Sequence, residues 1–324
     1  MRSRVLYFPY IQVPETTWLT QMLLYWDQVS SIVPYDYVHN PESLGPYMLT
    51  LVREQLVHQV IPGAHIGEIP QFHERFIGFL DGLGPALDRR REEFARRNVC
   101  RIHIEKMGTI GDALVKLRVA QPEQYPWYNV ENQTADDFMS YLATTLGQLD
   151  SVDSSPLTDS DAHLTRLALA GVPQHHMAQQ LDSLRIQVLN EVLPVPTCVV
   201  PAAKLRAFKE KRAAELGDFR RRVERELVAA ANIADPALRQ RHLDVFFDEA
   251  KERILEIQES MDSAGWETAR SGLSVIVAIP GVSPTLGLVG AVLEAVTGRT
   301  QQRISPDFAY AAHAGIEVTG RAAA

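Results

Sequence analysis

The sequence predicts a helix-rich α/β (or α+β) protein, with an N-terminal α/β layer or incomplete barrel followed by a long antiparallel α-helical hairpin. Two observations carry this prediction. Short apolar runs alternate with helical patterns up to about residue 193, as in folds that stack strands and helices in layers. Two long charged segments, joined by a short link, then extend from Pro201 to Met261. We therefore expect an α/β domain over residues 1–196 and a helical domain over residues 197–324.

The expected strands are short apolar or alternating runs. Residues 99–105 alternate between apolar and polar side chains, which is the period of a strand with one buried face. The first apolar run, a helical pattern around Trp18 and the next apolar run form a β-α-β start, typical of a parallel sheet. The expected strands cover residues 5–11, 31–38, 99–105, 128–131 and 184–189. The expected helices cover residues 14–29, 47–60 and 70–98, with further helices beginning at Thr109, Thr134 and Thr158.

The hairpin is the most strongly patterned part of the chain. Its apolar residues follow an 11-residue period, which predicts nearly straight helices, and only Arg212 interrupts the apolar stripe. Asp235 and Pro236 suit the N-cap and first position of the second helix. The first helix is net basic and the second net acidic, so opposite charges can flank one apolar seam. We expect this hairpin to bind a protein partner or a second copy of the chain.

Composition narrows the functional classes. The chain has 324 residues, 46% of them hydrophobic and 22% charged, and a formal net charge of −8 at pH 7. A net negative charge disfavours wholesale binding to nucleic acid, and the basic run Arg220–Arg222 is better explained as a solvated helix face. Cys100 and Cys198 form neither a disulfide framework nor a zinc spacing, so we expect a cytoplasmic protein.

Polar residues end several of the expected strands. If these strands are parallel, the carboxylates of Asp36, Glu105, Glu131 and Glu191 meet at one rim, where α/β proteins place their sites. Such a cluster suits acid–base or metal-assisted hydrolysis. The competing interpretation is that strand ends are polar because they meet solvent.

Motifs for specific cofactors are absent from the sequence. It contains no GxxxxGK[ST] phosphate loop, no GxGxxG opening a helix and no GxSxG elbow. Asp159, Asp161 and His163 have a spacing that could hold a metal, but the first turn of a capped helix explains it better. The sequence therefore predicts no particular metal or cofactor.

The segment from Ser271 to Leu293 contains no charged residue. Its length could span a bilayer as one helix, but Pro280-Gly281 and Ser283-Pro284 break it into two short pieces. We expect this segment to be buried within the chain. A position in a subunit interface is the second expectation, and insertion of residues 271–296 into a membrane is the third.

Two parts of the sequence resemble a known family. The pattern LYFPYI at residues 6–11, then Trp18, LYWD at residues 24–27 and IVP at residues 32–34 resembles the start of an uncharacterised bacterial family of unknown function. The LPVP run at residues 193–196 is similar to a later part of that family. The resemblance implies a bacterial cytoplasmic protein and no known activity.

Three functional hypotheses follow. The first is a soluble bacterial interaction, oligomerisation or regulatory component that works through its hairpin. The alternative is a hydrolase-type enzyme that uses the carboxylates of the rim. The second alternative is a membrane-active effector that uses residues 271–296. The residues leave open whether the protein is an enzyme.

Overall fold

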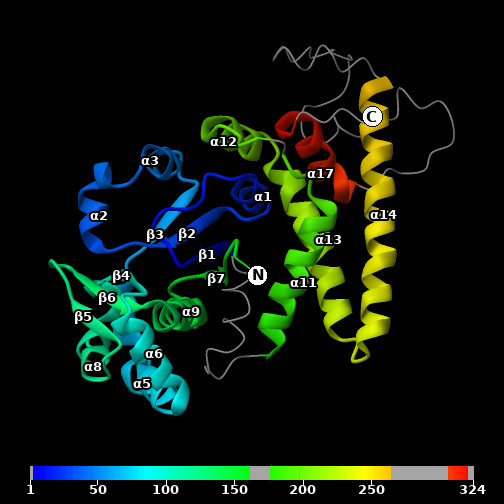
Figure 1. The fold of residues 1–324 in the computed structure, drawn as a ribbon. Helices are drawn as coiled ribbons and strands as arrows, with labels where there is room; N and C mark the ends of the chain where they lie inside the picture. Colours follow the sequence, from blue (N-terminus) through cyan, green and yellow to red (C-terminus); the bar gives the residue numbers. More distant parts are fainter. Residues whose placement is uncertain (1–2, 161–175, 197, 264–305, 320–324) are drawn as a thin grey trace. The chain divides into compact units, whose positions relative to one another are not determined.

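The computed structural model describes residues 3–160, 176–196, 198–263 and 306–319 (Figure 1). The chain divides into two compact units, residues 1–175 and 176–324. The division thus falls before α11 (His176–Val192), a segment that the sequence had placed in the first domain. Among the described residues, no helix is long and apolar enough to cross a membrane, and residues 271–296 lie outside that part of the chain.

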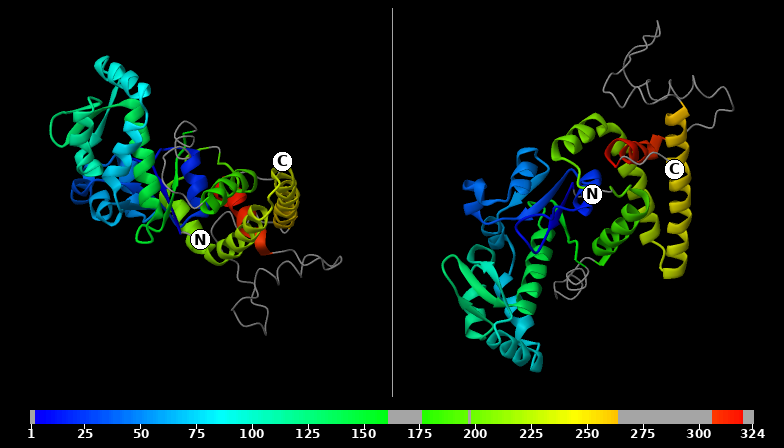
Figure 2. Two further views of the ribbon diagram at one scale, coloured as in Figure 1. Left: turned by 90° about the horizontal axis from the view of Figure 1, so that it is seen from below. Right: turned by 45° about the horizontal axis from the view of Figure 1, so that its top comes forward.

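The first unit contains two small sheets. One is a parallel sheet with the strand order β3-β2-β1-β7, and the other is an antiparallel sheet with the order β4-β6-β5. The parallel strands are β1 (Arg4–Tyr7), β2 (Gln28–Ile32), β3 (Val57–Val60) and β7 (Ser154–Leu157). The antiparallel strands are β4 (Val99–His103), β5 (Ala120–Pro122) and β6 (Trp127–Glu131). Figure 2 shows the antiparallel strands, cyan to green, beside the parallel strands β1, β2 and β3 in blue.

Helices connect and cover these strands. Helix α1 joins β1 to β2, and these two strands pair in parallel, so the expected β-α-β start is confirmed. The helices are α1 (Thr17–Tyr25), α2 (Tyr35–His39), α3 (Pro46–Arg53), α4 (Pro62–His65), α5 (Phe72–Asp81), α6 (Pro85–Ala95), α7 (Ile104–Met107), α8 (Ile110–Lys116) and α9 (Asn132–Gln148). One apolar core joins the two sheets, because Phe8 and Ile32 of the parallel part cluster with Ile102, Val130 and Phe138 of the antiparallel part.

Three expected elements differ from the structure. The strand expected over residues 31–38 covers Gln28–Ile32 instead, and helix α2 begins at Tyr35. The helix expected over residues 47–60 ends at Arg53, and β3 follows it. Gln55 has a positive φ of 56°, and the Leu56 N–H donates to the Leu51 carbonyl over 2.9 Å, a helix-ending turn that usually requires glycine. Without a glycine, the sequence carried no sign of this end. The strand expected over residues 184–189 is wrong, because the segment lies inside α11. A short apolar run is compatible with the period of a strand and with that of a helix, and α11 is too long for a strand.

The second unit is helical. It contains α11, α12 (Ala202–Lys211), α13 (Ala213–Ala231), α14 (Pro236–Ser263) and α17 (Ala309–His313), with short turns at Pro306–Phe308 and Ala314–Val318. Aromatic side chains fill its core, where Phe219 lies 6.0 Å from Tyr310 and Phe246 lies 6.0 Å from Phe308 between ring centroids. The turn that contains Phe308 is thereby packed against α13 and α14.

The hairpin differs from the expected form. Arg212, with φ −111° and ψ 21°, separates α12 from α13, so one long first helix is wrong and the predicted long hairpin is not confirmed. Ion pairs from Arg222 to Glu249 at 3.0 Å and from His242 to Glu226 at 3.2 Å place α13 and α14 antiparallel to one another. The Asp235 cap is confirmed, because its carboxylate accepts from the N–H groups of residues 237 and 238 over 2.8 and 3.0 Å.

Candidate functional site

Glu131 does not join the expected rim of carboxylates. Strands β4 and β6 are antiparallel, with Glu131 opposite Val99 at the start of β4, whereas Glu105 follows the end of β4. The buried carboxylate of Glu131 caps α9 instead. It accepts from the N–H of Gln133 at 2.9 Å, from the N–H of Thr134 at 2.8 Å and from the Thr134 hydroxyl at 2.8 Å. These hydrogen bonds give the Glu131 carboxylate a structural role as the cap of α9.

Glu191 does not follow a strand. It lies on α11 in the second unit, where its carboxylate pairs with the Lys251 ammonium of α14 at 2.7 Å. The expected strand before it is a helix, so Glu191 is not at the end of a strand. Of the four predicted site residues, the structure leaves Asp36 and Glu105 in one neighbourhood.

Glu105 connects the second sheet to the carboxyl edge of the parallel sheet, which is the edge where β2 and β3 end. Its Oε2 accepts a hydrogen bond of 2.7 Å from the N–H of Tyr35, the first residue of α2. The residue before α2 is Pro34, which has no side chain for a cap, so Glu105 supplies the missing acceptor. Its Oε1 lies 3.1 Å from the position of a Cβ added to Gly63, the second residue of α4. Glu105 is therefore fitted against the ends of both strands.

His103 lies at the junction of β4 and α7. Its Nδ1 accepts from the Glu105 N–H over 3.2 Å, which leaves the proton of a neutral ring on Nε2. The ring is buried and meets Trp127 edge-on, with 5.2 Å between ring centroids. Burial lowers the pKa of His103, Lys106 lowers it further, and the negative charge of Asp36 works in the opposite direction. His103 is thus a neutral imidazole at pH 7 with a carboxylate nearby.

Lys106 is the residue of this neighbourhood that sequence reasoning missed. It lies in α7 and is only 4% exposed. Burial lowers the pKa of Lys106 to about 7. No sequence pattern indicated this burial, because Lys106 stands beside Glu105 and resembles an ordinary solvated ion pair. Its burial depends on how α7 packs after β4.

The four residues Asp36, His103, Glu105 and Lys106 are called the edge cluster below. They lie at or just after the ends of β2 and β4, and open parallel sheets bind ligands at the edge where β2 ends. The imidazole of His103 and the amine of Lys106, whose pKa burial lowers to about 7, can accept and donate protons near pH 7. Among the described residues, no group of three or more His, Cys, Asp and Glu side chains is placed to hold a metal ion.

The aspartates considered for a metal site are only partly described. Asp159 follows β7 and accepts from the Tyr7 hydroxyl over 3.3 Å. Asp161 and His163, which completed the possible ligand set, lie outside the described residues. The helical-cap explanation of these three residues therefore stays a prediction.

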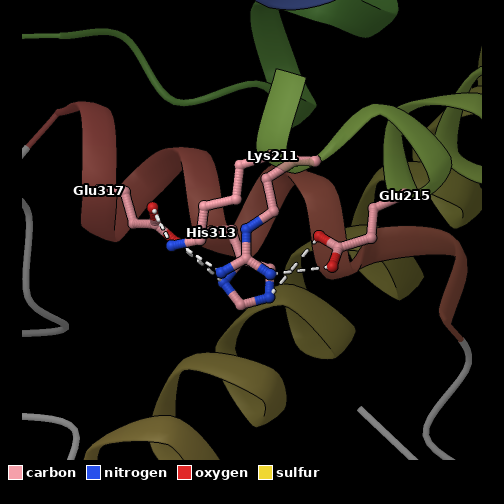
Figure 3. Close-up of polar contacts among 5 residues, drawn as sticks. Lys211, Glu215, His313 and Glu317 are labelled. Carbon is pink, nitrogen blue, oxygen red and sulfur yellow. Dashed lines mark hydrogen bonds and ion pairs between the residues drawn. The ribbon is translucent and has the colours of Figure 1, made fainter. Parts of the chain in front are cut away.

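The second unit contains a buried charge cluster that also escaped sequence reasoning. Figure 3 shows His313 between Glu215 and Glu317, at 3.7 Å from each carboxylate. The Arg212 guanidinium donates to Glu215 over 2.9 Å and to Glu317 over 2.5 Å, and Lys211 donates to Glu317 over 3.1 Å. Burial lowers the pKa of His313 to about 4, and the positive charges of Arg212 and Lys211 support the lowering against Glu317. This cluster joins α12 and α13 to the C-terminal helical turns.

Comparisons with known proteins supply no family. No protein-family model, curated protein or solved structure matches the chain. The resemblance of the N-terminal residues to an uncharacterised bacterial family therefore stays a prediction.

Proposed function

We propose that the first unit is an acid–base enzyme that binds a small polar molecule at the edge cluster and moves protons with His103. This is the hydrolase-type hypothesis in a revised form, with Asp36 and Glu105 kept and Glu131 and Glu191 removed. The observation that carries it is the gathering of a buried imidazole, a buried amine and two carboxylates at the carboxyl edge of a parallel sheet.

The roles follow from the hydrogen bonds. The Nδ1 of His103 is engaged by the Glu105 N–H, so Nε2 is the nitrogen that can exchange a proton with a ligand. Glu105 is fixed by the Tyr35 N–H and acts as a positioning residue for the α2 and α7 turns. Asp36 is exposed and free to turn toward a ligand, and its charge already acts on the His103 ring.

A ligand screen tests the proposal. Thermal unfolding of the full chain is measured with a panel of small esters, amides, phosphate esters and oxo acids, and with Mn²⁺ and Zn²⁺. We expect at least one class to raise the unfolding temperature, because a ligand that binds only the folded state stabilises it. Asp36→Asn and His103→Gln should remove the rise, and Asp150→Asn, an exposed aspartate of the same unit, should keep it. A rise that survives Asp36→Asn and His103→Gln contradicts the proposal.

A second candidate function is the interaction role first expected for residues 201–261. It is favoured by two exposed apolar side chains on α14, Leu238 at 60% and Val245 at 64% exposure. They are seven residues apart and so lie on nearly the same face of the helix. Light scattering over a range of concentrations tests self-association, and Val245→Asp should abolish it if α14 is the contact. A mass equal to one chain at every concentration counts against self-association.

The membrane-active alternative depends on residues 271–296, which lie outside the described residues. It remains a proposal that dye release from liposomes tests directly. A full chain that releases no dye counts against it.

A further inference from the structure

Lys106 is unusual among the buried basic side chains of the described residues. Three arginines there are also buried, at 6–8% exposure, and each is paired with carboxylates. Arg90 pairs with Asp137 at 2.6 Å, Arg185 with Glu224 at 2.7 Å, and Arg212 with Glu317 at 2.5 Å. No hydrogen bond or ion pair reaches Lys106 from any described residue, although it is only 4% exposed.

This isolation determines the form of the amine. A buried ammonium without a partner costs several kcal/mol, and a lysine escapes that cost by losing its proton. The pKa of Lys106 is lowered to about 7 with burial as the cause. A neutral amine is a nucleophile, whereas the ammonium form of an exposed lysine is not.

The surroundings suit the same chemistry. His103 precedes Lys106 by three residues and lies at the start of the same helical turn, α7. The two side chains are close enough for the charge of Lys106 to lower the pKa of His103. A neutral imidazole beside a neutral amine can carry the proton that the amine loses when it attacks a carbon atom.

We propose that Lys106 is a nucleophilic amine that forms an imine with an aldehyde or ketone bound at the edge cluster. In this step the lysine nitrogen attacks the carbonyl carbon, and a proton passes from nitrogen to the carbonyl oxygen through His103. The carbinolamine then loses its hydroxyl group together with the remaining proton of the lysine nitrogen as water, and the neutral imine remains. The inference rests on the proposed function of the edge cluster and narrows its substrate to carbonyl compounds.

Reductive trapping tests the proposal on the full chain. The protein is incubated with pyruvate, glyoxylate or acetaldehyde and sodium cyanoborohydride at about pH 7, and labelled lysines are located by peptide mass spectrometry. About half of the Lys106 amine is neutral at this pH, against less than a thousandth of an ordinary lysine. We expect Lys106 to be labelled at least about ten-fold faster than the exposed Lys116 of α8. The ratio of rates is smaller than the ratio of neutral fractions, because a less basic amine is also a weaker nucleophile.

Variants assign the label. Lys106→Met should remove the fast label, and Lys116→Met, the matched control in the same unit, should leave it unchanged. His103→Gln should slow the labelling of Lys106 without moving it to another residue. The Lys106 rate should rise to half its maximum near pH 7, whereas the Lys116 rate should keep rising above about pH 9.

Two results overturn the inference. One is a Lys106 that stays unlabelled with all three probes, and the other is a Lys106 that reacts no faster than Lys116. Both are read on the unsubstituted chain, so they do not depend on whether a variant folds. If trapping fails while a ligand still stabilises the chain through Asp36, only the imine step fails and the proposed site stands.

Discussion

Acid should weaken the helical unit through His313. The side chain is 6% exposed, and its pKa is lowered by burial from 6.5 to about 4. As the pH falls below 6.5, the unfolded chain binds a proton on this imidazole while the folded chain does not. The unfolded state therefore gains stability, and the folded unit loses it, until the pH reaches about 4.

The magnitude follows from the two pKa values. A shift of about 2.5 pKa units corresponds to about 3 kcal/mol when the titration is complete. Between about pH 7.5 and pH 5 most of that change has occurred, so the loss is about 2 kcal/mol. Glu317 has a lowered pKa, so its contribution is lost only at more acidic pH and changes little in this window.

Urea unfolding measures this loss. The transition is followed by circular dichroism at several pH values, and hydrogen exchange of peptides from α13 and α17 assigns it to the second unit. His313→Gln keeps a polar side chain between Glu215 and Glu317 but cannot take up the proton. We expect this variant to lose about 2 kcal/mol less than the unsubstituted chain between the two pH values. His242→Gln, which removes a partly exposed imidazole of α14, is the control. An equal acid sensitivity of the unsubstituted chain and His313→Gln refutes the reasoning.

Three further predictions follow from buried groups. Glu131→Ala removes three hydrogen bonds at the start of α9 and should lower the free energy of unfolding by about 2–3 kcal/mol, as measured by urea unfolding. Glu191→Ala removes only an exposed ion pair and should leave the urea unfolding transition unchanged. Arg212→Met removes the hydrogen-bonded ion pairs that the buried guanidinium makes with Glu215 and Glu317, and it should lower the free energy of unfolding of the second unit by about 2–3 kcal/mol. Burial raises the pKa of Cys100 to about 11, so iodoacetamide at about pH 8 should modify the exposed Cys198 and spare Cys100, as read by mass spectrometry.

Each of these has a contrary outcome. Equal effects of the two glutamate substitutions contradict the capping role of Glu131. Arg225→Met, an exposed arginine of α13, is the control for Arg212, and an equal loss from both contradicts the buried network. Alkylation of both cysteines at one rate contradicts the burial argument for Cys100.

Local patterns determined a good part of this protein. The apolar first run and the helical spacing around Trp18 predicted the β-α-β start, because both signals lie in adjacent residues. Asp235 and Pro236 predicted the start of α14 for the same reason, since a cap is made by residues two and three positions away. The sequence also marked Arg212 as the position that interrupts an apolar stripe.

Only the tertiary structure decided how these parts meet. Alternation predicts a strand but not the direction of its neighbour, and the antiparallel pairing of β4 and β6 separates Glu131 from Glu105. Arg212 breaks the helix and is buried because Glu317, far along the chain, supplies a partner. Lys106 is buried because the packing of α7 covers it, and no described residue makes a hydrogen bond or ion pair with it. Strand direction, ion pairing and burial depend on residues distant in sequence, so the local patterns that predicted the elements could not predict the candidate site.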